Sequence, residues 1–155
     1  MTVVALERRH RSALVRVLER SSEFRPEEVV VAIELLDAAL GGDGSYRCWV
    51  AEDERAAAVG YACFGRTPLT AWTFDLYWLA VDPAARRARW GRRLVERVVE
   101  SVRAEGGRVV RVETSSKYGG AVTRAFYTNV GFAEAGRIAE FYGEGDDLAL
   151  YALSL

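Results

Sequence analysis

The stretch VDPAARRARWGRRLVERVV, residues 81–99, places a cluster of arginines between a strand-like segment and a helix-like segment. Five arginines fall within residues 86–93, and the apolar residues at 94, 95, 98 and 99 follow on one face of a helix. The preceding segment 73–82, TFDLYWLAVD, is rich in aromatic and β-branched residues, which favour a strand. We therefore predict a strand, a basic loop and a helix that begins near Gly91.

This junction has the features of a binding site for a phosphorylated ligand. The N-terminus of a helix presents unpaired backbone N–H groups and a partial positive charge. Gly91 allows the backbone to approach phosphate oxygens closely, and arginines add forked donors. Two alternatives remain. The arginines of the helix can form its polar face beside nearby glutamates, which is the favoured interpretation for Arg93 and Arg97, and an arginine cluster can also bind nucleic acid.

The composition is that of an ordinary globular protein. The chain has 155 residues, of which 28% are charged, and we assign residues 1–155 to a single domain. Its net charge of −1 gives no general attraction to nucleic acid or to acidic membranes. No apolar run approaches the length of a membrane span, and the first residues do not resemble a secretory signal. We therefore expect a cytoplasmic protein with neither a nucleic acid nor a membrane as its partner.

The cysteines and the histidine do not predict a metal site. Cys48 and Cys63 lie in strand-like surroundings without metal-ligand spacing, and we expect buried, reduced thiols, with a cross-strand disulfide as the alternative. His10 is the only histidine, which argues against mechanisms that need several. Because it stands among three arginines, we expect it on an exposed helix face without a role.

Apolar periodicity and turn residues predict the order of the elements. A short strand is followed by two helices, three strands, a helix, a strand, a helix and two final strands, which together indicate one mixed α/β sheet. The expected strands span 2–6, 46–52, 57–65, 73–82, 109–114, 138–142 and 148–153, and the expected helices lie around 13–18, 26–40, 91–105 and 121–129.

Two motifs resemble those of the GNAT family of N-acetyltransferases. VDPAARRARWG, residues 81–91, resembles the family's acetyl-CoA pyrophosphate signature, V-x-P-x-x-(Q/R)-x-x-G-x-(G/A). AFYTNVGF, residues 125–132, resembles its second signature in the Phe-Tyr and Gly-Phe pairs, and further segments are similar to an uncharacterised bacterial subgroup. The resemblance covers essentially the whole chain. It implies an α/β fold of the α+β type, with a mostly antiparallel central sheet flanked by about four helices.

The resemblance also implies a cosubstrate, a partner and a set of binding residues. It implies acetyl-CoA without a metal, an amine of a small molecule or peptide as acceptor, and a homodimer as one possible assembly. Arg89 stands where the family has its first glycine. If that position needs a left-handed backbone, a non-glycine residue costs about 1–2 kcal/mol; if the glycine provides clearance, Arg89 blocks the site. The implied cofactor-binding residues are Leu79, Ala80, Val81, Arg86, Arg87, Ala88, Arg89, Trp90, Gly91, Arg92 and Tyr127.

Acetyl transfer needs a proton acceptor and a proton donor. A free alkylamine has a pKa of about 10.4, so the enzyme must remove a proton before the amine attacks. By resemblance Tyr127 is the general acid, although it could simply pack its helix onto the sheet. Glu113 and Asp75 are the candidate bases, with an exposed strand residue and a solvated strand end as the respective alternatives. Acceptor recognition is expected from the region between the first two helices and from the loop 66–72, with these candidates: Glu23, Phe24, Arg25, Trp72 and Tyr142.

Three functions follow from these observations. The first is an acetyl-CoA-dependent N-acetyltransferase. The alternative is a degenerate member of the family that binds CoA or a partner without turnover, which the arginine at position 89 motivates. The third is nucleic-acid binding by the arginine cluster, against which the near-neutral net charge argues.

Overall fold

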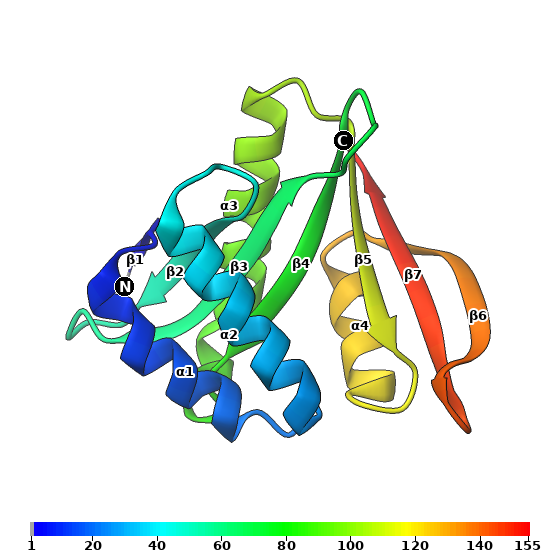
Figure 1. The fold of residues 1–155 in the computed structure, drawn as a ribbon, viewed down its shortest axis with the longest axis horizontal. Coiled ribbons are helices and arrows are strands. Elements are labelled where there is room, and N and C mark those ends of the chain that lie inside the picture. Colours follow the sequence, from blue (N-terminus) through cyan, green and yellow to red (C-terminus); the bar gives the residue numbers. More distant parts are fainter. Residues whose placement is uncertain (1) are drawn as a thin grey trace.

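The computed structural model describes residues 2–155 and consists of one seven-stranded sheet with helices on both faces (Figure 1). The strands are β1 (Thr2–Ala5), β2 (Arg47–Glu52), β3 (Ala58–Arg66), β4 (Thr73–Val81), β5 (Val109–Ser115), β6 (Ala133–Gly143) and β7 (Asp146–Ser154). The helices are α1 (Arg11–Arg20), α2 (Pro26–Gly41), α3 (Trp90–Ala104) and α4 (Gly120–Asn129), with short 3-10 helices η1 (Arg8–His10) and η2 (Pro83–Ala88).

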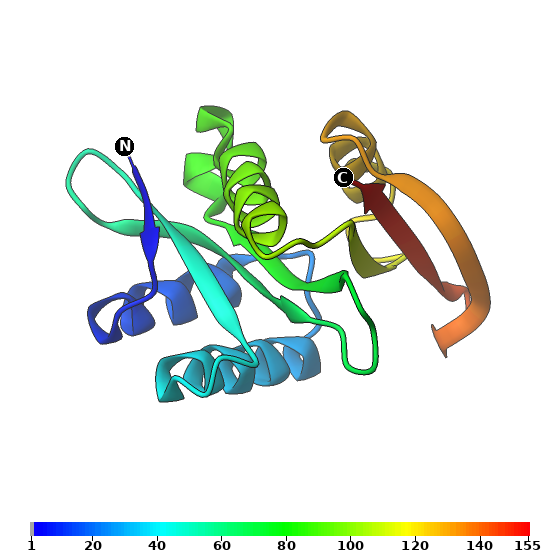
Figure 2. The ribbon, with the colours of Figure 1, turned by 90° about the horizontal axis from the view of Figure 1, so that it is seen from above.

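The sheet is mostly antiparallel, as the family resemblance implies. Its strand order is β1-β2-β3-β4-β5-β7-β6, and only the central β4–β5 pair is parallel. Helices α1 and α2 cover one face, and α3 and α4 cover the other (Figure 2). None of the helices within residues 2–155 is long and apolar enough to cross a membrane.

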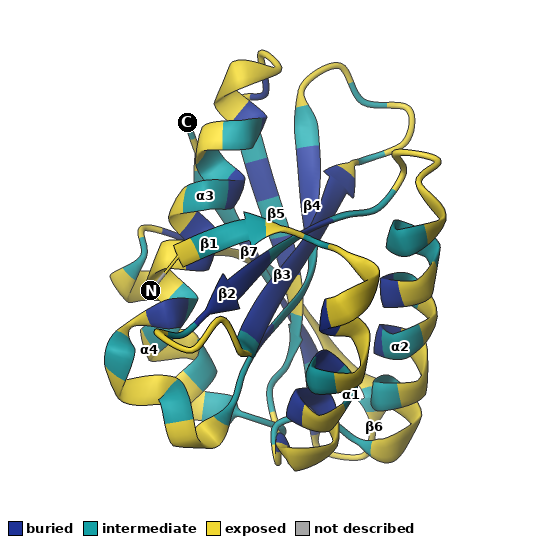
Figure 3. Ribbon diagram, turned by 90° about the vertical axis from the view of Figure 1, so that its left-hand side faces the viewer, coloured by how far each residue is buried: buried dark blue, intermediate teal, exposed yellow. Residues whose placement is uncertain are grey.

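The helix boundaries follow the expected sequence signals. Pro26 occupies the first turn of α2, where its missing N–H costs nothing, and Gly42, whose φ is +78°, is the C-cap that follows the last helical residue. The apolar stripe of α3 is buried, and the central strands of the sheet are buried beneath the helices (Figure 3). Strand β6 begins at Ala133, five residues before the predicted start. Almost all of its residues are exposed, so the alternation that marks a half-buried strand is missing.

Each face of the sheet has its own core. One core contains Leu14 of α1, Leu36 of α2 and Tyr61 of β3, and the other includes Phe74 and Leu94. Cys48 and Cys63 stand opposite each other in the β2–β3 register, and both are buried and free, as expected for reduced thiols. The neighbouring Cys63 thiol and burial raise the pKa of Cys48, which keeps the thiol protonated.

The expectation for His10 is wrong, because its side chain is buried. Its Nδ1 accepts a hydrogen bond from the Glu7 backbone N–H (3.0 Å), so the proton is on Nε2, which donates to Glu52 Oε1 (2.9 Å). Glu52 is itself buried, and Arg9 pairs with the same oxygen at 2.7 Å. The partner lies 42 residues away in the chain, so local sequence context could not reveal it.

Glu52→Gln is expected to lower the free energy of unfolding at pH 7 by about 1–2 kcal/mol, because it removes a charged hydrogen-bond acceptor from a buried site. The His10 hydrogen bond, opposed by burial and assisted by Arg9, lowers the pKa of Glu52. Its contribution is therefore present above the unfolded-state pKa and is lost as the pH falls through the folded-state pKa. Urea titrations between about pH 7 and pH 3 should show a smaller acid-induced loss in the variant. Glu54→Gln, in the exposed turn, is the matched control and should change neither quantity.

Candidate functional site

A cleft opens where β4 and β5 separate. The two strands pair only over Thr73–Asp75 and Val109–Arg111, and Figure 1 shows them together at one end and apart at the other. Strand β4 also carries a bulge at Tyr77 beside the cleft, since in the β3–β4 register Cys63 pairs with residue 78 and the next pair joins residues 64 and 76. The resulting cleft has a volume of about 950 Å³. Beyond the paired residues, the edge of β4 at residues 76–79 and the edge of β5 at residues 112–115 face each other without pairing. The backbone N–H and C=O groups on these two edges can therefore bond to an extended ligand.

The basic loop closes one end of this cleft. It forms η2, whose first turn is capped by Asp82 accepting from the backbone N–H of Ala84 (2.9 Å). Arg89 follows in the left-handed conformation, with φ +57° and ψ +28°, and α3 begins at Trp90. The backbone at the family's first glycine position is therefore left-handed, and Arg89 adopts it. No side chain caps α3, so the backbone N–H groups of its first turn remain available to an anion.

The arginines of this stretch divide into two groups. Arg86, Arg89 and Arg92 line the cleft. Arg92 also donates to the backbone oxygen of Asn129 (2.8 Å), which ties α3 to the end of α4. On the outer side of α3, Arg97 lies over the ring of Trp49 at 4.0 Å and pairs with Glu100 at 3.1 Å, and Arg93 lies over Trp90 at 5.2 Å. The polar-face interpretation is confirmed for Arg93 and Arg97.

Several residues that the signature implies do not present their side chains to the cleft. Trp90 is 2% exposed and packs in the core between α3 and the sheet. Ala80 faces the other core, because successive residues of a strand point to opposite sides, and Leu79 and Val81 face the cleft instead. The side chains of Arg87 and Ala88 also lie outside the cleft lining. Trp90 and Ala80 can therefore meet a ligand in the cleft only through their backbone, whereas the exposed side chain of Arg87 lies outside the lining in this structure.

Gly91 has a structural requirement that the sequence did not indicate. A Cβ atom at this position would lie 2.9 Å from Cε2 of Phe126, a contact that real side chains essentially never make. The glycine therefore allows α4 to pack against the start of α3. Since Gly91 also lines the cleft, the same residue serves packing and access.

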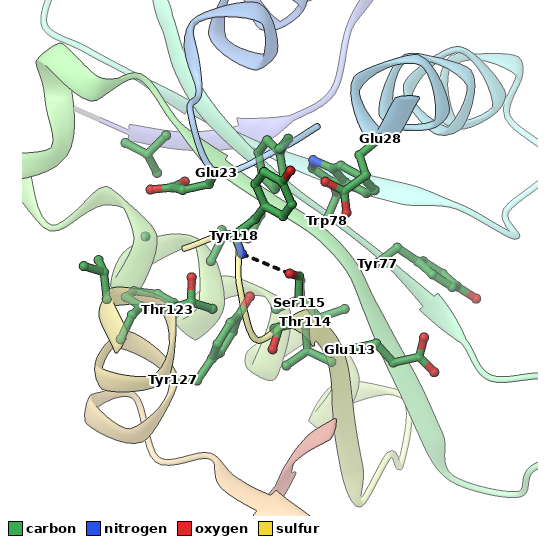
Figure 4. Close-up of a pocket in the computed structure, with 18 of the residues that line it drawn as sticks. Glu23, Glu28, Tyr77, Trp78, Glu113, Thr114, Ser115, Tyr118, Thr123 and Tyr127 are labelled. Carbon is green, nitrogen blue, oxygen red and sulfur yellow. Dashed lines mark hydrogen bonds between the residues drawn. The ribbon is translucent and has the colours of Figure 1, made fainter. Parts of the chain in front are cut away.

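Tyr127 lies on α4, and its hydroxyl points toward the end of β5 (Figure 4). The residue is buried, and its ring stacks on Tyr151 (5.8 Å between centroids) and meets the edges of Phe126 and Phe132. It also lines the cleft. Burial, and then the charge of Glu23, raise the pKa of Tyr127, so the phenol keeps its proton throughout the neutral range.

The two candidate bases are joined by an arginine. Asp75 is buried and accepts hydrogen bonds from Arg111 Nε and from Thr67 Oγ1 (2.9 Å), so it is not a solvated strand end. The other side of the Arg111 guanidinium lies 3.5 Å from a Glu113 carboxylate oxygen. The hydrogen bond to Asp75 raises the pKa of Arg111, so the guanidinium stays charged. Of the two carboxylates, Glu113 is the exposed one, and both line the cleft.

The residues expected to recognise the acceptor are only partly together. Glu23, Phe24 and Tyr142 line the cleft, whereas Arg25 is not part of the lining and lies over the ring of Tyr142 at 5.1 Å. No residue of the loop 66–72 is part of the lining. That loop joins β3 to the paired start of β4, at the closed end of the wedge, and its Trp72 is covered by Arg108 at 4.5 Å. Among the lining residues that the sequence did not reveal as such are Glu27, Glu28, Arg111 and Tyr118.

Comparisons with known proteins assign this architecture to a family. The sequence profile of the acetyltransferase (GNAT) domain matches residues 44–134. A protein assigned to the GNAT family from Desulfovibrio desulfuricans is 38% identical, with a TM-score of 0.90 over 99% of this chain and 98% of that one. No curated protein gives a significant sequence match.

More distant structures share the fold. An aminoglycoside 6′-N-acetyltransferase complexed with coenzyme A is 17% identical, with a TM-score of 0.81 over 99% of this chain and 97% of that one. A ribosomal-protein-alanine N-acetyltransferase from Brucella melitensis is 22% identical, with a TM-score of 0.79 and full coverage of both chains. Together, the domain match and the 38% identical relative show that the chain belongs to the GNAT family of acetyltransferases.

Proposed function

We propose that the protein transfers an acetyl group from acetyl-CoA to the amine of a small molecule or peptide. The observation that carries this proposal is the wedge between β4 and β5, which ends at an uncapped helix N-terminus beside Arg86 and Arg89. An extended arm can lie along unpaired strand edges while its phosphates meet N–H groups and guanidinium groups. A solved structure of the same fold contains coenzyme A, which supports the choice of ligand.

The residues of the cleft fit acetyl-CoA in shape and charge. Arg86, Arg89, Arg92 and the first turn of α3 would hold the phosphates, and the facing edges of β4 and β5 would hold the pantetheine arm. Arg89 already has the left-handed backbone that a glycine would supply there, so the substitution leaves the loop conformation available. Acetyl-CoA supplies the acetyl group as an activated thioester.

Two side chains can move the protons of this reaction. Tyr127 carries a proton on a hydroxyl that points into the cleft, and can donate it to a departing thiolate. Glu113 is exposed beside the cleft and can take up the proton of the amine through water. Asp75 accepts from both Arg111 and Thr67, so we assign it to positioning Arg111, which lies beside Glu113.

The charges of the cleft favour an amine as the acceptor. Three of the four lining arginines lie at the α3 end, and the fourth is Arg111. Glu27, Glu28 and Glu113 lie among the lining residues, and Figure 4 shows Glu28 and Glu113 on the same side as Tyr77. Carboxylates and aromatic rings attract a group that arrives as an ammonium ion. The two named N-acetyltransferases of this fold act on different amines, so the fold leaves the acceptor open.

Two measurements test the proposal. The melting temperature of the protein should rise with acetyl-CoA, since a ligand that binds the native state stabilises it. Release of the CoA thiol should then be followed spectroscopically over a panel of amines. Binding without turnover on any amine would favour the degenerate, CoA-binding alternative, and the absence of both binding and turnover would refute the proposal.

Arg89→Gly is expected to weaken CoA binding by about 2- to 5-fold, because it removes one cation from the phosphate end. The loss of left-handed strain and the entropy gained by the unfolded chain nearly cancel, so the free energy of unfolding should change by about 1 kcal/mol or less. Calorimetric titration and urea denaturation check these expectations. Arg93→Gly, on the outer side of α3, is the control for CoA affinity and should leave it unchanged. A large gain in CoA affinity in Arg89→Gly would show instead that Arg89 blocks the site.

A further inference from the structure

The five-residue loop between α1 and α2, residues 21–25, is fixed on both sides. At its start, the hydroxyl of Ser21 donates to the backbone of α1 (3.0 Å). Near its end, Phe24 packs against Trp78 in the cleft wall, with ring centroids 5.0 Å apart. The next residue, Arg25, lies over the rings of Tyr118 and Tyr142. Glu23 is therefore held over the cleft by a loop that also contributes to the acceptor end.

Glu23 occupies the phosphate end of the cleft. Its Oε1 lies 2.9 Å from Nη1 of Arg86, the residue that matches the Gln/Arg position of the pyrophosphate signature. Its Cγ lies beside Gly119, immediately before α4, and a Cβ atom on that glycine would stand 3.7 Å from it. Figure 4 shows Glu23 reaching from the loop toward the side of the cleft where Thr123 and Tyr127 lie. A carboxylate thus pairs with a cation that the proposed function assigns to phosphate.

We propose that Glu23 is an internal anion that holds Arg86 in the free protein and that the coenzyme phosphates displace. This inference rests on the proposed function, because it takes the coenzyme as the competing anion. A carboxylate and a phosphate that share one guanidinium repel each other, so binding of the second weakens the hold of the first.

Glu23→Gln is expected to tighten CoA binding about 2- to 5-fold, since it removes the competing charge and keeps the size of the side chain. The effect is modest because the Arg86 and Glu23 side chains are 40% and 28% exposed, and partly exposed ion pairs are weak. Calorimetric titration with CoA measures it. In an Arg86→Gln background, the same substitution should have no effect, because the cation for which the two anions compete is gone.

Glu27→Gln is the matched control, since Glu27 lines the same cleft and forms no ion pair with Arg86. It should leave CoA affinity unchanged. An equal gain in Glu27→Gln would overturn the proposal, because it would reflect only the general field of the cleft. If the wild type binds CoA and Glu23→Gln binds it no more tightly, the internal anion is refuted while the proposed function stands. If no variant binds CoA, the proposed function fails as well.

Discussion

Replacing Tyr127 by phenylalanine is expected to lower kcat about 100- to 1000-fold, with little change in CoA affinity or stability. General acid catalysis contributes about this much when the donor is well placed. The substitution removes only the hydroxyl and keeps the ring, which stacks on Tyr151 and packs against Phe126 and Phe132. The measurements are steady-state kinetics with an amine identified from the panel, together with calorimetric titration of CoA.

Tyr151→Phe is the matched control for this prediction. Tyr151 is stacked on Tyr127 but does not line the cleft, so its hydroxyl should be dispensable and kcat should stay within about 2-fold. The loss in Tyr127→Phe should also shrink with an acetyl donor whose thiol is more acidic, since a better leaving group needs less protonation. A loss of kcat that is the same for all donors would show that Tyr127 acts only by packing.

Trp90→Ala is expected to lower the free energy of unfolding by about 3–5 kcal/mol, the range found when large aromatic residues are removed from a core. Trp90 is 2% exposed and belongs to the cluster that joins α3 to the sheet, although it lies within the signature that implies cofactor binding. Urea denaturation monitored by circular dichroism measures this loss. Arg87→Ala, an exposed neighbour, should change stability by less than about 0.5 kcal/mol.

Trp90→Phe separates packing from ligand contact at the same position. It should keep most of the stability, and CoA affinity should remain within about 2-fold because the ring points into the core. A large loss of CoA affinity in a well-folded Trp90→Phe would show that the ring reaches the ligand. A loss of less than about 1 kcal/mol in Trp90→Ala would contradict its place in the core.

The order of the elements was readable from the sequence because each rests on local signals. Aromatic and β-branched runs indicate strands, and Pro26 and Gly42 mark the ends of α2. The start of α3 followed from the motif and the apolar stripe together. The start of β6 was missed because an exposed edge strand has no alternating pattern, and its partner β7 lies later in the chain.

The arrangement of the site depended on contacts between distant segments. Asp75 and Arg111 meet because β4 and β5 pair in parallel with these two residues in register, and nothing near either residue reveals that register. The pairing of Glu23 with Arg86 likewise joins a helix connection to the basic loop. The signature predicts a phosphate-binding loop but could not show that Trp90 turns inward, because it describes residue types along the backbone and not side-chain directions.

The short parallel seam of the sheet has a mechanical consequence. Within residues 2–155, three residue pairs over Thr73–Asp75 and Val109–Arg111 join strands β1–β4 to strands β5–β7, with two further backbone hydrogen bonds to the oxygen of Trp72 at their start. A change in the angle between these two sets of strands strains few hydrogen bonds, whereas each set keeps its own antiparallel ladder. We therefore expect the cleft to widen for a bulky ligand by bending at this seam while both ladders stay intact, with the packing of α4 against α3 limiting how far it opens.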